Sequence, residues 1–128
     1  MAGFITNIED RTLANEHFRE VLFTADRMQL VVMALQAGEE IGTETHDDVD
    51  QFIRVEAGAG KAILDGEETE LTDGSVVVIP AGTTHNIVNA SATEALKLYT
   101  IYSPPEHPDG TINATRADAI AYEAEHHH

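Results

Sequence analysis

The stretch at residues 38–89 constrains the fold more than any other part of the chain, because it alternates short apolar runs with tight turns. One run, Val76–Ile79, leads directly into Pro80, which ends a strand because it cannot donate a hydrogen bond to the ladder. The pair Asp65 and Gly66 separates two further runs and favours the positive φ angles of a two-residue hairpin turn. Short strands joined by such turns predict a β-sandwich or barrel.

Further strands are expected on both sides of this stretch. Apolar residues are consecutive at 30–35, so we expect that strand to be covered on both faces. The barrel interior would cover one face, and the N-terminal arm or a second subunit the other. In all, the expected strands lie at residues 18–23, 28–35, 44–46, 51–55, 61–64, 68–71, 76–79 and 96–102.

The two ends of the chain differ from this centre. Residues 6–16 are polar with scattered apolar positions, which predicts a covering arm with one helical turn. Residues 104–110 are too rich in proline for regular structure, whereas residues 115–125 are alanine-rich and open with a helix-capping pair, which predicts a short outer helix. We expect one domain over residues 1–128, with its core at about 18–103 and a tail at 104–128. His126–His128 are either a natural end or a tag, and we leave them out of the site.

Composition excludes several classes of function. The 23 Asp and Glu residues outnumber the seven Lys and Arg, and the net charge of −16 repels phosphate backbones, so we expect no nucleic-acid partner. The absence of cysteine excludes disulfides and thiolate chemistry. No basic N-terminal region precedes an apolar run, and no run is long enough to span a bilayer. We therefore expect a cytoplasmic protein with no membrane partner.

Four polar residues of the central stretch are spaced so that they can converge. Glu44 and His46 lie two residues apart, so both side chains can point to the same side of a strand. Gln51 opens the next strand on a face that is otherwise apolar, and His85 follows a glycine-containing turn. If these strands face each other in a barrel, the four side chains point at one place.

The first part of this pattern resembles the first motif of the cupin superfamily. That motif is G, five residues, H-x-H, three or four residues, E, six residues, G. The chain has Gly38, Glu44, His46, Gln51 and Gly58 at the corresponding places. It departs from the family twice, with Glu44 where the first His is usual and Gln51 where a Glu is usual.

The second part resembles the second cupin motif in full. That motif is G, five residues, P-x-G, two residues, H, three residues, N, and it is matched by Gly74, Pro80, Gly82, His85 and Asn89. The resemblance implies an all-β fold, a double-stranded β-helix or jelly-roll barrel. The whole chain also resembles small single-domain cupins that are often labelled as similar to mannose-6-phosphate isomerase, a label that concerns the fold. Because such cupins are often dimers, we expect a homodimer.

The resemblance implies a divalent transition metal held by Glu44, His46, Gln51 and His85. Two imidazoles and one carboxylate with open positions suit Fe(II), and Mn, Zn, Ni or Cu are also compatible. The Gln51 amide either binds the metal or orients a water or substrate from behind the ligands. Asp50 is the substitute ligand if the strand register shifts by one residue. The alternative is a polar barrel rim without metal.

Other residues able to do chemistry lie outside the motifs. We expect His17 and His107 to be structural or exposed. Tyr99 and Tyr102 lie on opposite faces of one strand, so we expect at most one of them to reach the site.

The leading hypothesis is a metal-dependent enzyme acting on a small polar metabolite, namely a sugar, sugar acid or enol-forming carbonyl compound. The metal would serve as a Lewis acid in isomerase or lyase chemistry, and Glu44 is the candidate catalytic residue. A dioxygenase is the second enzymatic hypothesis. Phosphosugar isomerisation is disfavoured because no Arg or Lys occupies an inward-facing motif position. The alternative from another class is a non-catalytic small-molecule-binding module.

Overall fold

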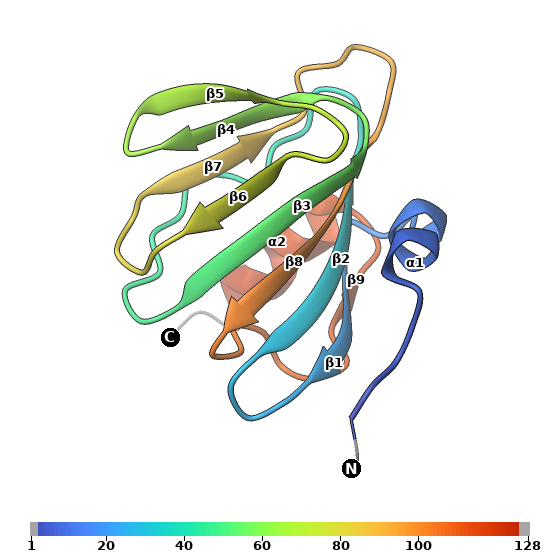
Figure 1. Ribbon diagram of the computed structural model, residues 1–128, viewed down its shortest axis with the longest axis vertical. Helices are drawn as coiled ribbons and strands as arrows, with labels where there is room; N and C mark the ends of the chain where they lie inside the picture. Colours follow the sequence, from blue (N-terminus) through green and yellow to red (C-terminus); the bar gives the residue numbers. More distant parts are fainter. Residues whose placement is uncertain (1–2, 126–128) are drawn as a thin grey trace.

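Two antiparallel sheets face each other in the computed structural model, which describes residues 3–125 (Figure 1). Within that range the larger sheet has the order β6-β3-β8-β2-β1-β9 and the smaller sheet the order β5-β4-β7. This is the all-β arrangement that the sequence predicts. The strands are β1 (Arg19–Thr24), β2 (Gln29–Leu35), β3 (Asp50–Ala57), β4 (Gly60–Leu64), β5 (Glu67–Leu71), β6 (Val76–Ile79), β7 (His85–Val88), β8 (Leu96–Ser103) and β9 (Ile112–Asn113).

The turns lie where glycine and aspartate predict them. The β4–β5 hairpin turns at Asp65 and Gly66, whose φ angles are 49° and 86°. Gly58 has a φ of 94°, and a Cβ atom there would lie 2.5 Å from the carbonyl oxygen of Ala95. This motif glycine is therefore required both by its backbone conformation and by the close approach of the chain leading into β8.

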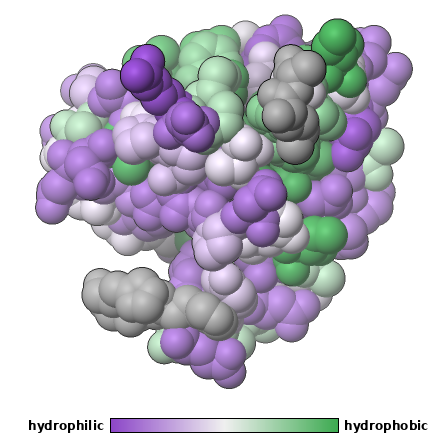
Figure 2. Space-filling model, turned by 90° about the horizontal axis from the view of Figure 1, so that it is seen from below, coloured by the Kyte–Doolittle hydropathy of each residue, from purple (hydrophilic) through white to green (hydrophobic). Residues whose placement is uncertain are grey.

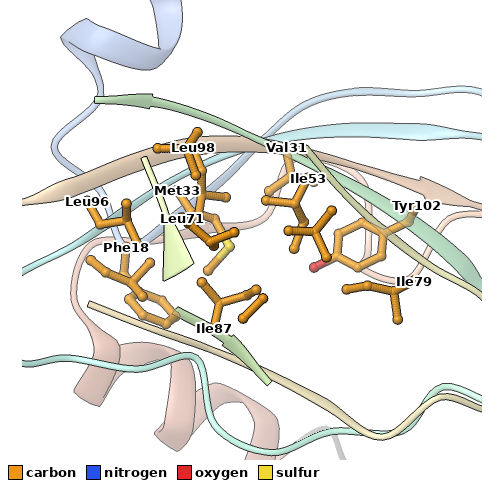
Figure 3. Close-up of a cluster of buried hydrophobic side chains, with 14 of the residues drawn as sticks. Phe18, Val31, Met33, Ile53, Leu71, Ile79, Ile87, Leu96, Leu98 and Tyr102 are labelled. Carbon is orange, nitrogen blue, oxygen red and sulfur yellow. The ribbon is translucent and has the colours of Figure 1, made fainter. Parts of the chain in front are cut away.

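The space between the sheets is filled by alternating residues of the strands. Fully buried side chains from β2, β3, β7 and β8 form its centre, and Figure 3 shows them meeting across the interior, with Phe18 and Leu96 at one side and Ile79 and Tyr102 at the other. Because side chains alternate across a strand, the same strands present a second set of residues outward.

The outer face of β2 is covered within the same chain at Val32 and Ala34. Helix α1 (Ile8–Ala14) packs on β2, β3 and β8, and Val32 and Ala34 are only 1% exposed. The N-terminal arm thus contains a seven-residue helix, longer than the single turn expected, because Asn7 caps it by accepting a hydrogen bond from the backbone of Asp10.

The segment between β2 and β3 differs from the expectation. Instead of a strand around Glu44 and His46, residues 36–49 form a loop with isolated bridges, Glu40 to Val88 and Glu44 to His85. Polar residues dominate this segment, so it has little apolar surface with which to extend the smaller sheet. The loop still runs beside β7, which keeps Glu44 next to His85.

The tail folds back over the barrel. Residues 104–111 form an irregular segment, and helix α2 (Arg116–Glu125) follows β9, with the hydroxyl of Thr115 accepting from the backbone of Asp118 at its start. Ala119 of α2 belongs to the buried core, and Arg116 donates to the carbonyl oxygen of Glu40 at 2.6 Å. The predicted helix is confirmed. His126–His128, which we left out of the predicted site, lie outside the described residues.

The many acidic residues of the chain predict a hydrophilic surface. Seen from below, it is mostly hydrophilic with separate apolar patches (Figure 2). None of the helices in residues 3–125 has the length and apolar character needed to cross a bilayer.

Candidate functional site

The predicted site residues are brought together where three backbone segments meet. Glu44 and His85 exchange both backbone hydrogen bonds at 2.8 Å, and the backbone NH of Gly82 donates to the carbonyl oxygen of His46 at 2.8 Å. The loop carrying Glu44 and His46 is thereby attached to the turn that carries His85. Gln51 starts β3 nearby, and pairs with Tyr102 of β8 in the ladder.

Glu44, His46 and His85 lie in contact range of one another. The Glu44 Oε2 atom is 3.2 Å from His46 Nε2, and the two imidazole ring centroids are 5.4 Å apart. His85 Nδ1 lies 2.9 Å from the carbonyl oxygen of Thr83, which can only accept, so Nδ1 carries the proton. When His85 is neutral, its Nε2 atom is then an acceptor, as a metal-binding imidazole requires.

Gln51 presents an unsatisfied oxygen to the interior. Its side chain is buried, and its Nε2 donates to the hydroxyl of Thr100 at 2.9 Å. Its Oε1 atom has no hydrogen-bond partner; among buried side-chain atoms of residues 3–125, only Arg19 Nε shares that condition. An unpaired buried acceptor costs about 1–3 kcal/mol, so it calls for an explanation in a ligand.

The electrostatics of the Glu44–His46 pair favour charges on both partners. Burial would raise the pKa of Glu44, but the hydrogen bond from His46 and the charges of His46, Arg19 and His85 together lower it. The hydrogen bond to Glu44 raises the pKa of His46, although burial opposes the change. Without a metal the two side chains form an ion pair, and a cation would have to displace the proton of His46.

Glu106 joins this site from the tail, which sequence reasoning missed. Its Oε1 atom lies 3.5 Å from His46 Nδ1, and burial raises the pKa of its carboxyl group. Fully buried Gln29 holds the segment in place, accepting from the backbone NH groups of Glu106 and His107 and donating to the carbonyl oxygen of His107. No motif marks Glu106, because its position depends on this contact between distant segments.

Of the two tyrosines on opposite faces of β8, Tyr102 is the one that reaches the site. Its ring centroid lies 6.3 Å from that of His46 and 5.1 Å from that of His107, and burial raises the pKa of its hydroxyl group. Burial also lowers the pKa of His107 to about 3. His107 is thus a neutral, structural ring beside the site, whereas Tyr99 packs near Phe52 on the outer face.

The remaining candidates lie outside the cluster. The Oδ1 atom of exposed Asp50 accepts from the backbone NH of Ala81 at 2.8 Å, so it stabilises the turn before His85. His17 contacts Glu20 at 2.8 Å and takes no part in the site.

The side chains of Glu44, His46, Gln51 and His85 are suitable donors for a divalent metal. Within residues 3–125, however, no group of three His, Asp or Glu residues is already placed to hold a metal ion. The carboxylate of Glu44 bonds to His46 instead, and the fourth donor is the Gln51 amide. One carboxylate, two imidazoles and a carbonyl oxygen without a partner are suitable ligands for a first-row metal. Loading would require Glu44 and His46 to exchange their mutual contact for contacts to the ion.

Comparisons with known proteins place this geometry in a family. The family model described as "Cupin domain" matches residues 31–102, which include all four predicted ligands. The uncharacterized protein YrkC of Bacillus subtilis is 44% identical over 126 residues, covering 94% of this chain and 67% of YrkC. The uncharacterized protein L612 of Acanthamoeba polyphaga mimivirus is 46% identical over 116 residues, covering 88% of this chain and 72% of L612.

A solved structure is similar over almost the entire fold. The crystal structure of BH2720 from Bacillus halodurans is 44% identical and superposes with a TM-score of 0.89. The match covers 92% of this chain and 93% of that chain. The similarity therefore extends beyond the barrel to the arm and tail.

Proposed function

The chain belongs to the cupin family, and on that premise we propose that it is a metal-dependent enzyme acting on a small polar metabolite. Glu44, His46, Gln51 and His85 would be the ligands of the metal. The observation that carries the proposal is the buried Gln51 Oε1 atom, which has no partner although the other end of the same amide is held by Thr100.

The anchoring of Gln51 supports a ligand role. In this arrangement Nε2 donates to Thr100, which leaves Oε1 free to accept from, or bind to, another group. A cation satisfies a carbonyl oxygen and a neutral imidazole together, whereas Gln51 Oε1 has no hydrogen-bond donor among the described residues. The free Nε2 of His85 agrees with the same occupant.

A divalent metal in this position would supply Lewis-acid polarisation of substrate oxygens, or oxygen activation if it is Fe(II). The chain's own contribution starts with Glu44, which stays ionised because of its positive neighbours. A carboxylate oxygen of Glu44 can take a proton from a carbon next to a carbonyl group, which fits isomerisation or elimination on a sugar, sugar acid or enol-forming carbonyl compound. Buried Tyr102 keeps its proton and can donate a hydrogen bond.

A non-catalytic small-molecule-binding module is the second candidate. Figure 3 shows the bulky side chains of Ile53 and Ile79 beside Tyr102, on the side of the interior where the site lies. Apolar side chains this close to the ligands reduce the space for a substrate and favour capture over turnover.

We also propose that the protein is a homodimer formed through the outer face of the larger sheet. Val78, Phe52, Ile101 and Leu30 are consecutive ladder neighbours on that face, and Val78 is 61% exposed. With a net charge of −16, two copies repel each other unless the contact is apolar. Sedimentation should show a dimer that Val78→Asp converts to a monomer; a monomeric parent chain would overturn this assignment.

The test of the metal proposal is metal content by mass spectrometry on a chain ending at Glu125, which lacks the terminal histidines. We expect about one metal per chain after reconstitution, and loss of the metal in His85→Ala. His17→Ala is the matched control, because that histidine lies outside the cluster and should leave the content unchanged. Absence of binding with Fe, Mn, Zn, Ni and Cu would overturn the proposal.

Turnover separates the two candidate functions. Sugar acids, diketones and aromatic diols are incubated with the loaded chain, with and without oxygen. Turnover that disappears in folded Glu44→Gln supports the enzyme. Saturable binding without turnover of any of these compounds supports the binding module.

A further inference from the structure

Arg19 of β1 is a buried cation outside both motifs. Its side chain is 3% exposed, and it is the only Lys or Arg in residues 3–125 that is buried. Burying a guanidinium is costly unless its donors are paired. The position of Arg19 therefore needs a reason beyond packing.

The strand directs Arg19 to the interior of the barrel. Its neighbour Glu20 points outward, where it contacts Arg11 of α1 and His17. Since side chains alternate along a strand, Arg19 shares the inner face with Val21, a member of the buried core. The guanidinium also lies over the ring of Phe18, 5.4 Å from its centroid.

The partners of Arg19 satisfy only part of its guanidinium. Its Nη1 atom donates to Asn113 at 3.3 Å and to Glu123 at 3.1 Å, but Glu123 is 52% exposed and thus well solvated. Its Nε atom is buried without any partner. The edge that includes Nε is one of the edges of a guanidinium that can bind a carboxylate with two parallel hydrogen bonds.

The charge of Arg19 acts on the candidate site. After burial itself, it is the next largest influence on the pKa of both Tyr102 and His107, and it also contributes to lowering the pKa of Glu44. Tyr102 is in turn the ladder neighbour of Gln51. The two buried atoms without partners, a donor on Arg19 and an acceptor on Gln51, both belong to side chains buried in the barrel.

We propose that Arg19 binds the carboxylate of the substrate, and that the substrate is a small hydroxy or keto acid. This inference rests on the proposed function and narrows its substrate class. A carboxylate would satisfy the Nε–H edge of Arg19, while a neighbouring hydroxyl or carbonyl oxygen of the same molecule would lie toward Gln51 and its fellow ligands. Each of the two unsatisfied buried atoms would then have an occupant.

A carboxylate fits the charges better than a phosphate does. Glu44 and Glu106 already place negative charge around His46. A phosphate dianion would meet that charge with a single buried cation to offset it, whereas a carboxylate brings one negative charge and the planar shape that matches a guanidinium. Phosphosugar isomerisation is disfavoured by the sequence because no motif position supplies an inward-facing Arg or Lys. Arg19 does face inward from outside the motifs, but the surrounding negative charge still disfavours a phosphate.

The experiment follows the Arg19 Nε–H signal by ¹⁵N NMR while glycolate is added to the full chain, with and without metal. Glycolamide, a neutral molecule of the same size, is the matched probe. We expect glycolate to shift the signal saturably and glycolamide to leave it unchanged. In the metal-loaded chain, Arg19→Met should weaken glycolate binding at least tenfold in calorimetry while metal content stays at the parent level.

Control variants separate binding from structure. Arg54→Met removes a cation from the outer face of β3 and should leave glycolate binding unchanged. Glu123→Gln removes the solvated partner of Arg19 but keeps the guanidinium, so glycolate should bind as tightly or more tightly, even if Arg19→Met does not fold.

The outcomes distinguish this inference from the metal proposal. A metal-loaded chain whose Arg19 signal ignores glycolate would overturn the carboxylate assignment alone. A chain that binds no metal but whose Arg19 signal responds to glycolate would overturn the metal proposal alone. A larger response to inorganic phosphate than to glycolate would show that the anion is a phosphate and would also overturn the assignment.

Discussion

The centre of the barrel and its polar end are built in opposite ways. In the centre, Met33, Leu35, Ile53 and Leu98 are fully buried, and the strands around them exchange regular ladder hydrogen bonds. At the polar end, Gln51 Oε1 is buried without a partner and an ion pair joins Glu44 to His46; Arg19 Nε, the other buried atom without a partner in residues 3–125, belongs to a guanidinium that lies over Phe18. The centre is filled by its own side chains, whereas the polar end leaves a buried acceptor without a partner, which is why we propose a ligand there.

The largest expected effect is on the centre. Leu98→Ala removes a fully buried side chain and should lower the free energy of unfolding by about 3 kcal/mol. Urea unfolding measures the change, and Ile112→Ala, at a position that is 56% exposed, is the control with little effect. Metal content per folded chain should be unchanged in both variants. A lower metal content per folded chain in Leu98→Ala would show that metal binding depends on packing in the centre, and would contradict the independence of the two regions.

Acid should act on the surroundings of the polar end. In the folded chain the pKa of His107 is lowered to about 3 from 6.5, so between these values the unfolded state binds more protons and stability falls as pH falls. We expect a loss of about 2 kcal/mol between pH 6.5 and 4, allowing for partial solvent exposure. Urea unfolding across this range measures it. His107→Gln should flatten the slope, and an unchanged slope would show that other groups are responsible.

Gln51→Met should separate stability from metal binding. The substitution removes the unpaired acceptor together with its bond to Thr100, so we expect the free energy of unfolding of the metal-free chain to change by less than about 1 kcal/mol. Metal affinity should fall about tenfold or more, because a ligand is lost. Calorimetry with Zn²⁺ and urea unfolding give the two quantities. Equal metal affinity in variant and parent would place Gln51 outside the ligand set.

The smallest expected effect concerns Glu106. Hydrogen bonding to Glu44 and the charge of Glu106 both contribute to the raised pKa of His46, so metal must displace a proton and affinity should rise with pH. Glu106→Gln lowers that pKa and should shift the loading curve to lower pH by less than about one unit. Metal titrations at a series of pH values check this. A shift to higher pH would contradict the placement of Glu106 beside His46.

Much of the fold could be predicted because its signals are local. The β4–β5 hairpin follows from Asp65 and Gly66, and the alternation on β8 places Tyr99 and Tyr102 on opposite faces, as expected. The closeness of Glu44, His46 and His85 follows from motif spacing. The shape of the segment that carries Glu44 could not be predicted, because its single bridge to His85 depends on the neighbouring strand and not on its own propensity.

By itself, the sequence determined most of the strands, the turns and the family, since each of these depends on residues that are near one another in the chain or held at constant spacing; β7 and β9 were not among the expected strands. Only the tertiary structure decided the surroundings of the site. Glu106 reaches His46 because Gln29, far away in sequence, holds its backbone, and Arg19 faces inward against α2 from a strand with no motif. Such contacts join segments about 80 to 100 residues apart, and no local pattern records them.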